Sequence, residues 1–303
     1  MKAVRVVGWG RPLAIEDVPQ PTAGNDEVLV RVHAASVNPV DKMIAAGYLQ
    51  GFFSAPLTLG SDFAGEIVTV GASVQQFKPG DRVYRMSPAL GSFAEYAAVK
   101  AFAVAHSPRS LDDVQAASVP LVGLSAWQTL FDLAQLKSGE RVLILGAGGA
   151  IGSLAVQLAK GKGAYVIALA RGDKAEFVKG LGADEFIDGD SQRFEDVVGH
   201  VDVVLDTIGG DYVERSYTVL KPGGRFVTLA AMLPEGAGKD RGIVASGAFT
   251  QPNGAQLQQL AELIDDGKLR VFVNRTFPLA ETPAAESYKA ADGSPGKVVI
   301  TVK

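Results

Sequence analysis

Cysteine is absent from this chain of 303 residues, and histidine occurs only three times. Without a thiol, the chain cannot form disulfides, use a thiolate nucleophile or bind zinc through cysteine. The three histidines, His33, His106 and His200, lie far apart in the sequence, which does not favour a His-rich metal site. We therefore expect a protein without a metal centre.

An excess of basic residues is also missing, because 29 Lys and Arg stand against 33 Asp and Glu, for a net charge of −4. This balance excludes a polybasic nucleic-acid binder. No stretch of roughly 18 uncharged apolar residues occurs without several glycines, so no membrane span is expected. The segment Met1–Gly10 carries charge and glycine, and predicts a strand rather than a signal peptide. A cytoplasmic location is the resulting expectation.

Short strands separated by turns dominate the first part of the chain, up to roughly residue 110. Val28–Val32, Gly65–Val70 and Arg82–Tyr84 are rich in β-branched or aromatic residues, and glycines and a Pro-Gly pair at 79–80 lie between them. Helical periodicity is weak here. This segment predicts an antiparallel β domain.

Beyond Pro120, apolar strands alternate with helical segments. Strands are expected at 141–145, 165–170, 186–187, 202–205 and 225–229, with helices near 151–160 and 174–181. Such alternation predicts an α/β fold with a doubly wound parallel sheet. Ile243–Ala245 is a candidate sixth strand. A helix near 256–266 and strands near 271–274 and 297–302 then predict a return to the first domain.

A glycine-rich turn, Gly146–Gly152, lies between an expected strand and an expected helix. Glycines at such a turn let backbone N–H groups and a helix N-terminus approach a pyrophosphate. Gly146 and Gly148 match the start of the dinucleotide-binding motif, but Ile151 stands in the place of the third glycine and Gly152 follows it. The pattern predicts a dinucleotide site, and a turn needed only for packing is the alternative.

The end of the second strand indicates which dinucleotide binds. NAD enzymes usually place a carboxylate there for the ribose 2′-OH, whereas this strand ends in Ala170 and Arg171. Arg171 can bind a 2′-phosphate, and Lys174 can add positive charge. In the alternative interpretation, both are solvated residues that open a helix capped by Asp173. We favour NADP(H).

Many motifs of the chain, in their order and spacing, resemble those of the zinc-free medium-chain dehydrogenase/reductases of the quinone oxidoreductase type. The resemblance runs over essentially the whole length. It is carried by the segments at 36–41 (SVNPVD), 59–65 (LGSDFAG), 79–84 (PGDRVY), 91–96 (GSFAEY), 119–127 (VPLVGLSAW), 181–184 (LGAD), 206–210 (DTIGG), 220–224 (LKPGG) and 296–299 (GKVV), together with the glycine turn.

The resemblance implies a GroES-like catalytic domain formed by residues 1–120 and 250–303. It also implies a Rossmann NADP-binding domain at 121–249, with a cleft between the two domains. Family members transfer a hydride from NADPH to quinones or to α,β-unsaturated carbonyls. Zinc-dependent relatives have metal ligands near Asn38 and Ser61, where this chain offers neither Cys nor His. Catalysis must then polarise the acceptor by hydrogen bonds or use an electrophilic acceptor.

The family pattern also assigns roles to single residues. Asn38 and Asp41 match positions that line the nicotinamide cleft, although Asn38-Pro39 is also a good turn and Asp41 a good helix cap. Met43 stands where relatives have Tyr or Lys, which leaves Tyr48 as a proton-donor candidate. Besides Arg171 and Lys174, the expected cofactor contacts are Ser125, Gly148, Gly149, Ala150, Ile151, Ile208, Leu229, Phe249, Thr250 and Lys297. For Lys297, an exposed strand residue is the alternative.

The leading functional hypothesis is an NADPH-dependent oxidoreductase that reduces small quinones or related enones. An alkenal or enone reductase and a non-catalytic NADPH-binding sensor remain open as alternatives. A homodimer is expected as well, because a strand at the edge of the sheet near 242–249 would leave backbone groups and apolar side chains unpaired. The resemblance implies the same arrangement, and a loop in the cleft is the other interpretation of this segment.

Overall fold

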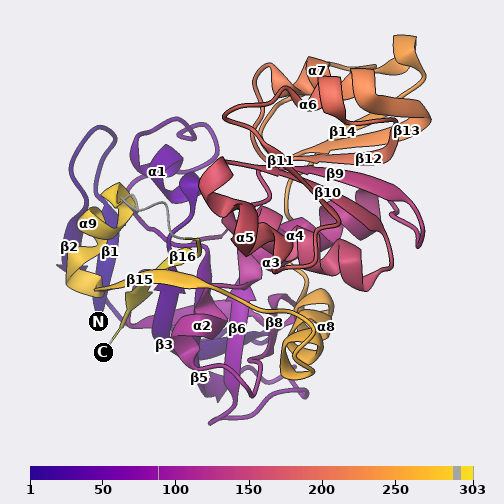
Figure 1. Cartoon of the computed structure of the whole chain (residues 1–303). Helices are drawn as coiled ribbons and strands as arrows, with labels where there is room; N and C mark the ends of the chain where they lie inside the picture. The colour runs from indigo at the N-terminus through magenta and orange to yellow at the C-terminus, as the bar shows by residue number, and fades with distance from the viewer. Residues whose placement is uncertain (88, 289–294, 303) are drawn as a thin grey trace. The chain divides into compact units, whose positions relative to one another are not determined.

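The computed structural model describes residues 1–87, 89–288 and 295–302 (Figure 1). The chain divides into two compact units. The first unit comprises Met1–Leu121, Gln251–Gly267 and Val271–Lys303, and the second comprises Val122–Thr250 and Lys268–Arg270. The break expected after residue 120 lies one residue from the observed one. The assignment of Lys268–Arg270 to the second unit was not expected. The Gln157 side chain binds this segment, because its amide NH₂ donates to the Arg270 carbonyl (3.0 Å) and its amide oxygen accepts the Arg270 N–H (2.8 Å).

The first unit contains a seven-stranded sheet and a smaller three-stranded sheet. The large sheet has the order β15-β16-β3-β5-β6-β8, and β7 also pairs with β3. Its strands are β3 (Glu27–Ser36), β5 (Asp62–Val70), β6 (Arg82–Met86), β7 (Tyr96–Lys100), β8 (Val104–His106), β15 (Val273–Pro278) and β16 (Lys297–Thr301). The small sheet holds β1 (Lys2–Val6), β2 (Ala14–Asp17) and β4 (Leu57–Thr58). The expected GroES-like β unit is confirmed, including the strands near both ends of the chain.

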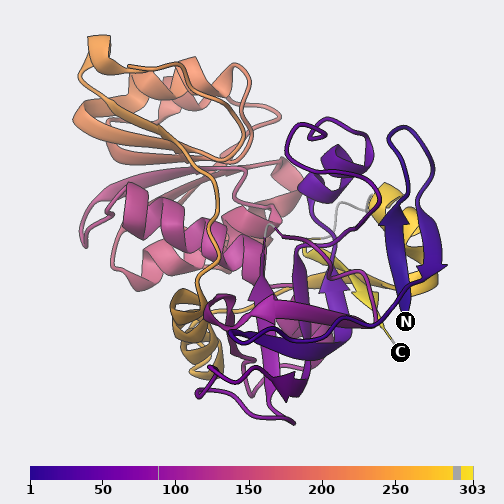
Figure 2. The same ribbon diagram turned by 180° about the vertical axis from the view of Figure 1, so that it is seen from behind.

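The buried side chains of β3 form part of the core of this unit. Along β3, Val28, Val30 and Val32 are at most 2% exposed, while Arg31 points to solvent. The helices are α1 (Pro39–Ala45), α2 (Asp113–Ala117), α8 (Gly254–Asp265) and α9 (Thr282–Ser287). Both ribbon views place α8 beside β8 (Figures 1 and 2). Tyr84 donates its hydroxyl to the Leu257 carbonyl (2.6 Å), which fastens α8 to the sheet.

The second unit is built on a six-stranded parallel sheet of order β11-β10-β9-β12-β13-β14. The strands are β9 (Arg141–Leu145), β10 (Tyr165–Ala170), β11 (Glu185–Asp188), β12 (Val201–Asp206), β13 (Leu220–Thr228) and β14 (Val244–Gly247). Figure 1 shows α4 (Ala150–Gly161) and α5 (Ala175–Lys179) on one side of the sheet, and α6 (Phe194–Val197) and α7 (Tyr212–Val219) on the other. The predicted doubly wound sheet is confirmed.

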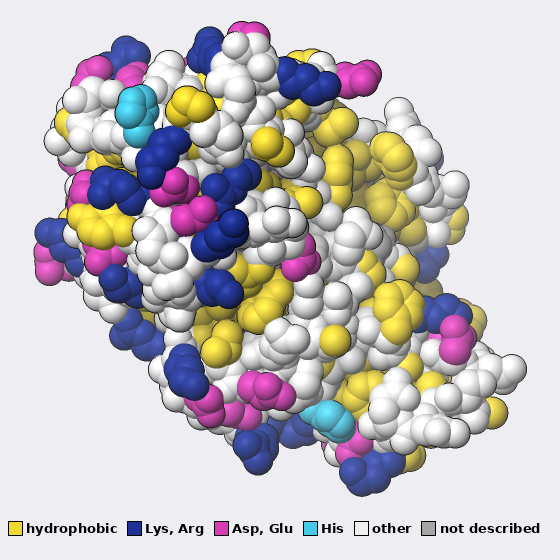
Figure 3. Space-filling view, turned by 90° about the vertical axis from the view of Figure 1, so that its right-hand side faces the viewer, with side chains coloured by type: hydrophobic (Ala, Val, Ile, Leu, Met, Phe, Trp, Pro, Cys, Tyr) yellow, Lys and Arg dark blue, Asp and Glu magenta, His cyan; other side chains and the backbone are white. Residues whose placement is uncertain are grey.

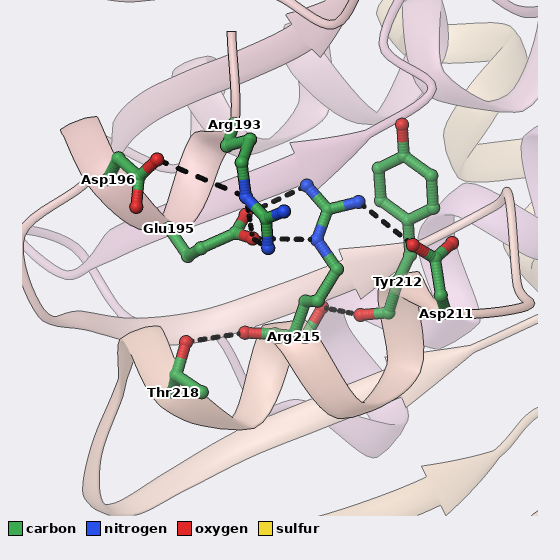
Figure 4. Close-up of polar contacts among 8 residues, drawn as sticks. Arg193, Glu195, Asp196, Asp211, Tyr212, Arg215 and Thr218 are labelled. Atoms are coloured by element: carbon green, nitrogen blue, oxygen red, sulfur yellow. Dashed lines mark hydrogen bonds and ion pairs between the residues drawn. The ribbon is translucent and has the colours of Figure 1, made fainter.

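Polar contacts hold the four-residue helix α6 against α7 (Figure 4). The Arg215 guanidinium lies 2.8 Å from Glu195 and stacks near the rings of Phe194 and Tyr212, 4.9 and 4.7 Å from their centroids. Arg193 also contacts Glu195, at 2.5 Å. The hydrogen bond from Arg215 lowers the pKa of Glu195 to about 2, so this carboxylate is ionised at neutral pH. The network therefore stabilises an element too short to be helical by itself.

Within the segment near 242–249, Val244–Gly247 form the strand β14, so the interpretation of the whole segment as a loop is wrong. β14 pairs in parallel with β13 at the edge of the sheet, and Val244 is 59% exposed.

Among the residues that the structure describes, no helix is long and apolar enough to span a membrane. On the face in Figure 3, basic and acidic side chains are interspersed rather than gathered into one basic patch.

Candidate functional site

The glycine turn of the second unit is fixed between the carboxyl ends of β9 and β10. The N–H groups of Gly146 and Ala147 donate to the Leu169 carbonyl (3.0 and 2.9 Å). Gly146 has φ +81°, and a Cβ there would meet the Thr207 hydroxyl at 2.3 Å. Gly149 is the N-cap of α4, whose first N–H groups lack acceptors within the helix. These groups can bind a pyrophosphate, and Gly148, Gly149, Ala150 and Ile151 all lie at this end of α4.

Gly152, one place beyond the usual third glycine, allows α4 to pack onto the turn. A Cβ at this position would lie 2.2 Å from the Gly146 carbonyl oxygen and 2.6 Å from the Ala147 Cα. Both neighbours are backbone atoms, so neither can rotate away. The shifted glycine thus performs the packing task that the motif requires.

Arg171 and Lys174 lie together at the end of β10, as the sequence suggested. Lys174 packs against Gly148, where a Cβ would be 2.9 Å from its Cγ. Asp173 lies between the two cations, 3.4 Å from Arg171 and 3.6 Å from Lys174. The Arg171 side chain is 67% exposed and also lies 4.0 Å from Asp190. Asp173 does not cap α5, because Lys174 is the N-cap of that helix.

Ile208 and Leu229 follow β12 and β13 at the same edge of the sheet. Asp206, which is fully buried, accepts the N–H groups of Ile208 and Gly209 (2.8 and 3.0 Å) and the Thr228 hydroxyl (2.8 Å). Leu229 donates its N–H to the Asp206 carbonyl (3.0 Å). Asp206 therefore shapes this part of the site, a role that sequence reasoning missed although the residue opens the DTIGG motif.

Ser125 and Thr250 are joined by a hydrogen bond between their hydroxyls (2.6 Å). Ser125 belongs to α3 (Pro120–Trp127) and is 1% exposed, while Thr250 follows β14. Phe249, the preceding residue, is 72% exposed. In the second unit, the predicted cofactor contacts thus gather at the turn, after β10, after β12 and β13, and at this hydroxyl pair.

The first unit holds a buried polar cluster, which we define as Ser36, Asn38, Asp41, Asp62 and Lys297. Asn38 caps α1 at its N-terminus, and Asp41 accepts the Asn38 N–H at 2.8 Å. Asp62 accepts the Ser36 hydroxyl (2.9 Å) and the Asn38 amide (3.0 Å). Lys297 donates to the Asn38 amide oxygen at 2.5 Å. The structure therefore brings Asn38, Asp41 and Lys297 together, and adds Asp62, which sequence reasoning missed.

Burial controls the ionisation of this cluster. It raises the pKa of Asp41 to about 8, although the Asn38 N–H and Lys297 act in the opposite direction. It also raises the pKa of Asp62 and lowers that of Lys297. Lys297 is 7% exposed, so its interpretation as an exposed strand residue is wrong. Asp41 can hold a proton at neutral pH.

Tyr48 differs from the buried cluster because it is 78% exposed. It lies in the turn after α1, where its N–H donates to the Met43 carbonyl (3.0 Å). Met43 and Phe52, from the same segment, are also exposed. Tyr48 is thus accessible to a small molecule, whereas the Asn38 and Asp41 side chains are buried.

Over 1–87, 89–288 and 295–302, no group of three or more His, Cys, Asp and Glu residues is arranged to hold a metal ion.

Comparisons with known proteins agree with this geometry. A family model described as alcohol dehydrogenase GroES-like domain matches residues 24–109, and one described as zinc-binding dehydrogenase matches 181–300. The mitochondrial NAD(P)H oxidoreductase RTN4IP1 of Mus musculus is 34% identical over 91% of this chain and 82% of its own length. The chloroplastic NADPH-dependent alkenal/one oxidoreductase of Arabidopsis thaliana is 37% identical over 92% and 73%. A quinone oxidoreductase structure from Coxiella burnetii is 33% identical, with a TM-score of 0.90 over 100% of this chain and 99% of that one.

Proposed function

Since the chain belongs to the medium-chain dehydrogenase/reductase family, we propose that it is an NADPH-dependent oxidoreductase that transfers a hydride to quinones or related enones without zinc. The relatives described above are an NAD(P)H oxidoreductase and an NADPH-dependent alkenal/one oxidoreductase, and both support NAD(P)H-dependent oxidoreduction. The observation that carries the proposal is the glycine turn at the carboxyl end of β9, next to Arg171 and Lys174. Both the turn and the two cations suit a phosphorylated dinucleotide.

The residues of the chain have separate tasks in this proposal. Nicotinamide supplies the hydride when it is bound. The turn at 146–152 binds the pyrophosphate, while Arg171 and Lys174 bind the 2′-phosphate. Ser125, with its hydroxyl fixed by Thr250, orients the nicotinamide end. The reduced acceptor then needs a proton, and the Tyr48 hydroxyl is exposed enough to donate one.

Oxidation of NADPH in the presence of a panel of small quinones, enones and alkenals tests the proposal. We expect turnover with quinones or enones, and undiminished turnover after dialysis against a strong chelator. Turnover restricted to alkenals would favour the alternative that the Arabidopsis relative represents. NADPH binding without turnover of any acceptor would indicate a binding protein. A zinc content of the purified protein that rises and falls with its activity would contradict the metal-free mechanism.

The cofactor preference gives a sharper prediction. Arg171→Ala should weaken NADPH binding by about ten- to a hundredfold, equivalent to about 1.5–3 kcal/mol for a charge-assisted hydrogen bond, while NADH binding changes little. Fluorescence titration with both cofactors measures this. Arg109→Ala, which removes an exposed arginine of the first unit, is the matched control and should change neither affinity. Equal losses of NADPH and NADH affinity in Arg171→Ala would contradict the assignment.

We further propose a homodimer in which two copies pair along β14. The strand lies at the edge of its sheet, and the exposed Val244 offers an apolar contact. Light scattering should give a dimeric mass for the native protein at concentrations well above micromolar. Val244→Pro removes a donor of the ladder between β13 and β14, so it should disrupt the edge strand and yield monomers. A monomeric native protein would refute the dimer.

A cytoplasmic location is the remaining part of the proposal. The relatives reported above include a mitochondrial and a chloroplastic protein, so the family occurs in more than one compartment. Cell fractionation followed by immunodetection of the native chain tests the location. Recovery in an organelle or membrane fraction would contradict it.

A further inference from the structure

Lys297 carries a buried ammonium group that the proposed hydride transfer does not use directly. Its Nζ donates to the Val37 carbonyl and to the Asn38 amide oxygen, both at 2.5 Å. Removal of an ammonium from water is costly, and replacement of a buried ion by an apolar residue often leaves stability unchanged or improves it. Folding alone therefore gives a weak reason for a cation at this position.

The contacts of Lys297 determine the orientation of the Asn38 amide. The amide oxygen accepts from Lys297, while the amide NH₂ donates to Asp62 (3.0 Å) and to the Ser36 carbonyl (3.3 Å). A flipped amide would direct its NH₂ at the ammonium and its oxygen at the carboxylate. The cation on one side and the anion on the other thus leave a single orientation.

The same chain of hydrogen bonds continues to α3. The second oxygen of Asp62 accepts the backbone N–H of Leu121 at 3.0 Å. Leu121 lies in the first turn of α3, the helix that also carries Ser125. Lys297, Asn38 and Asp62 therefore connect the first residue of β16 to the first turn of a helix with a proposed nicotinamide contact.

We propose that Lys297 is a positioning residue, which holds the Asn38 amide and, through Asp62, the first turn of α3 in the arrangement that the reduction requires. This inference rests on the proposed function. It replaces the direct cofactor contact expected from the sequence, because the ammonium is held by Val37 and Asn38 in its own unit. A rigid hydrogen-bonded support affects the rate through the geometry of the reacting groups.

Substitution of Lys297 by methionine tests the proposal, since methionine has a similar length and no charge. We expect kcat to fall by about 10- to 100-fold, as misplacement of reacting groups commonly causes, with the Kd for NADPH within about twofold of native. Lys297→Arg should recover part of the lost kcat. Lys100→Met, which removes a 50% exposed lysine of the same sheet, should leave kcat unchanged.

The side-chain amide signal of Asn38 in a ¹⁵N NMR spectrum, assigned by its loss in Asn38→Asp, gives a readout independent of turnover. In Lys297→Met this signal should shift and exchange faster with solvent. Native kcat in the variant would overturn the proposal, as would a Kd for NADPH that rises in parallel with the loss of kcat. If the native protein reduces no acceptor, the proposed function fails. An unchanged Asn38 signal would then separately overturn the positioning role.

Discussion

Gly152→Ala should weaken NADPH binding more than tenfold and lower the stability of the second unit by about 1–3 kcal/mol, the usual cost of overpacking. The new methyl group would lie 2.2 Å from the Gly146 carbonyl oxygen. Relief of that overlap must move α4 away from the turn, which displaces the N–H groups proposed to bind the pyrophosphate. Fluorescence titration with NADPH and thermal unfolding measure the two effects.

The same helix offers a matched control. Gly161 ends α4, and a Cβ there would meet nothing within 4 Å. Gly161→Ala should therefore leave NADPH binding unchanged and keep or slightly raise stability, because alanine favours a helix over glycine. If Gly152→Ala binds NADPH like the native protein, the close packing of α4 on the turn is not needed for the cofactor.

Asp41→Asn should make the free energy of unfolding less dependent on pH. Burial raises the pKa of Asp41 from 3.8 to about 8 in the folded protein. Below about pH 4 the carboxyl is protonated in both the folded and the unfolded protein, so it does not reduce the free energy of unfolding. As the pH rises towards 8, the unfolded chain loses this proton and the folded chain keeps it, so stability falls. Above the folded pKa of about 8, Asp41 is ionised in both states, and its whole contribution to the free energy of unfolding is lost.

Asparagine cannot ionise, and its amide oxygen can still accept the Asn38 N–H. At pH 8–9 the free energy of unfolding of the variant should therefore exceed that of the native protein, by roughly a few kcal/mol. Some slope should remain, because burial also raises the pKa of Glu286, to about 7. Urea unfolding between pH 4 and 9 measures this. Asp26→Asn, at an exposed carboxylate paired with Lys100, is the control and should keep the native slope. A native slope in Asp41→Asn would show that folded Asp41 is already ionised at neutral pH.

The strands of the second unit and its helices α4 and α5 could be predicted because their signals are local, whereas α6 and α7 were not predicted. β9 and β10 are short, largely apolar runs, and the glycines of the turn mark where β9 ends and α4 begins. Gly152 also shows what the sequence leaves open. Its displacement from the usual spacing weakened the motif, but the structure shows the backbone contact that makes a glycine necessary there.

The polar cluster of the first unit could be predicted only in part. Asn38 and Asp41 were found through a motif of neighbouring residues, whereas the contact of Lys297 with Asn38 spans 259 positions. That contact depends on the register in which β16 pairs with β3, with Val299 opposite Ser36. No local pattern encodes this register. Asp62 was missed because an acidic residue inside a buried strand has no periodic signal of its own.

The pairing of β16 with β3 has a consequence for the order in which the protein folds during synthesis. The second unit lies almost entirely within one continuous stretch, Val122–Thr250, so its sheet can form while the ribosome still holds the rest of the chain. β3 can pair early with β5 and β7, but its residues Ala34–Ser36 must wait for β16, which is made more than two hundred residues later. In a nascent chain halted before residue 297, the second unit could already be folded. The large sheet of the first unit would still lack β16, and the Asn38 amide would lack its contact with Lys297.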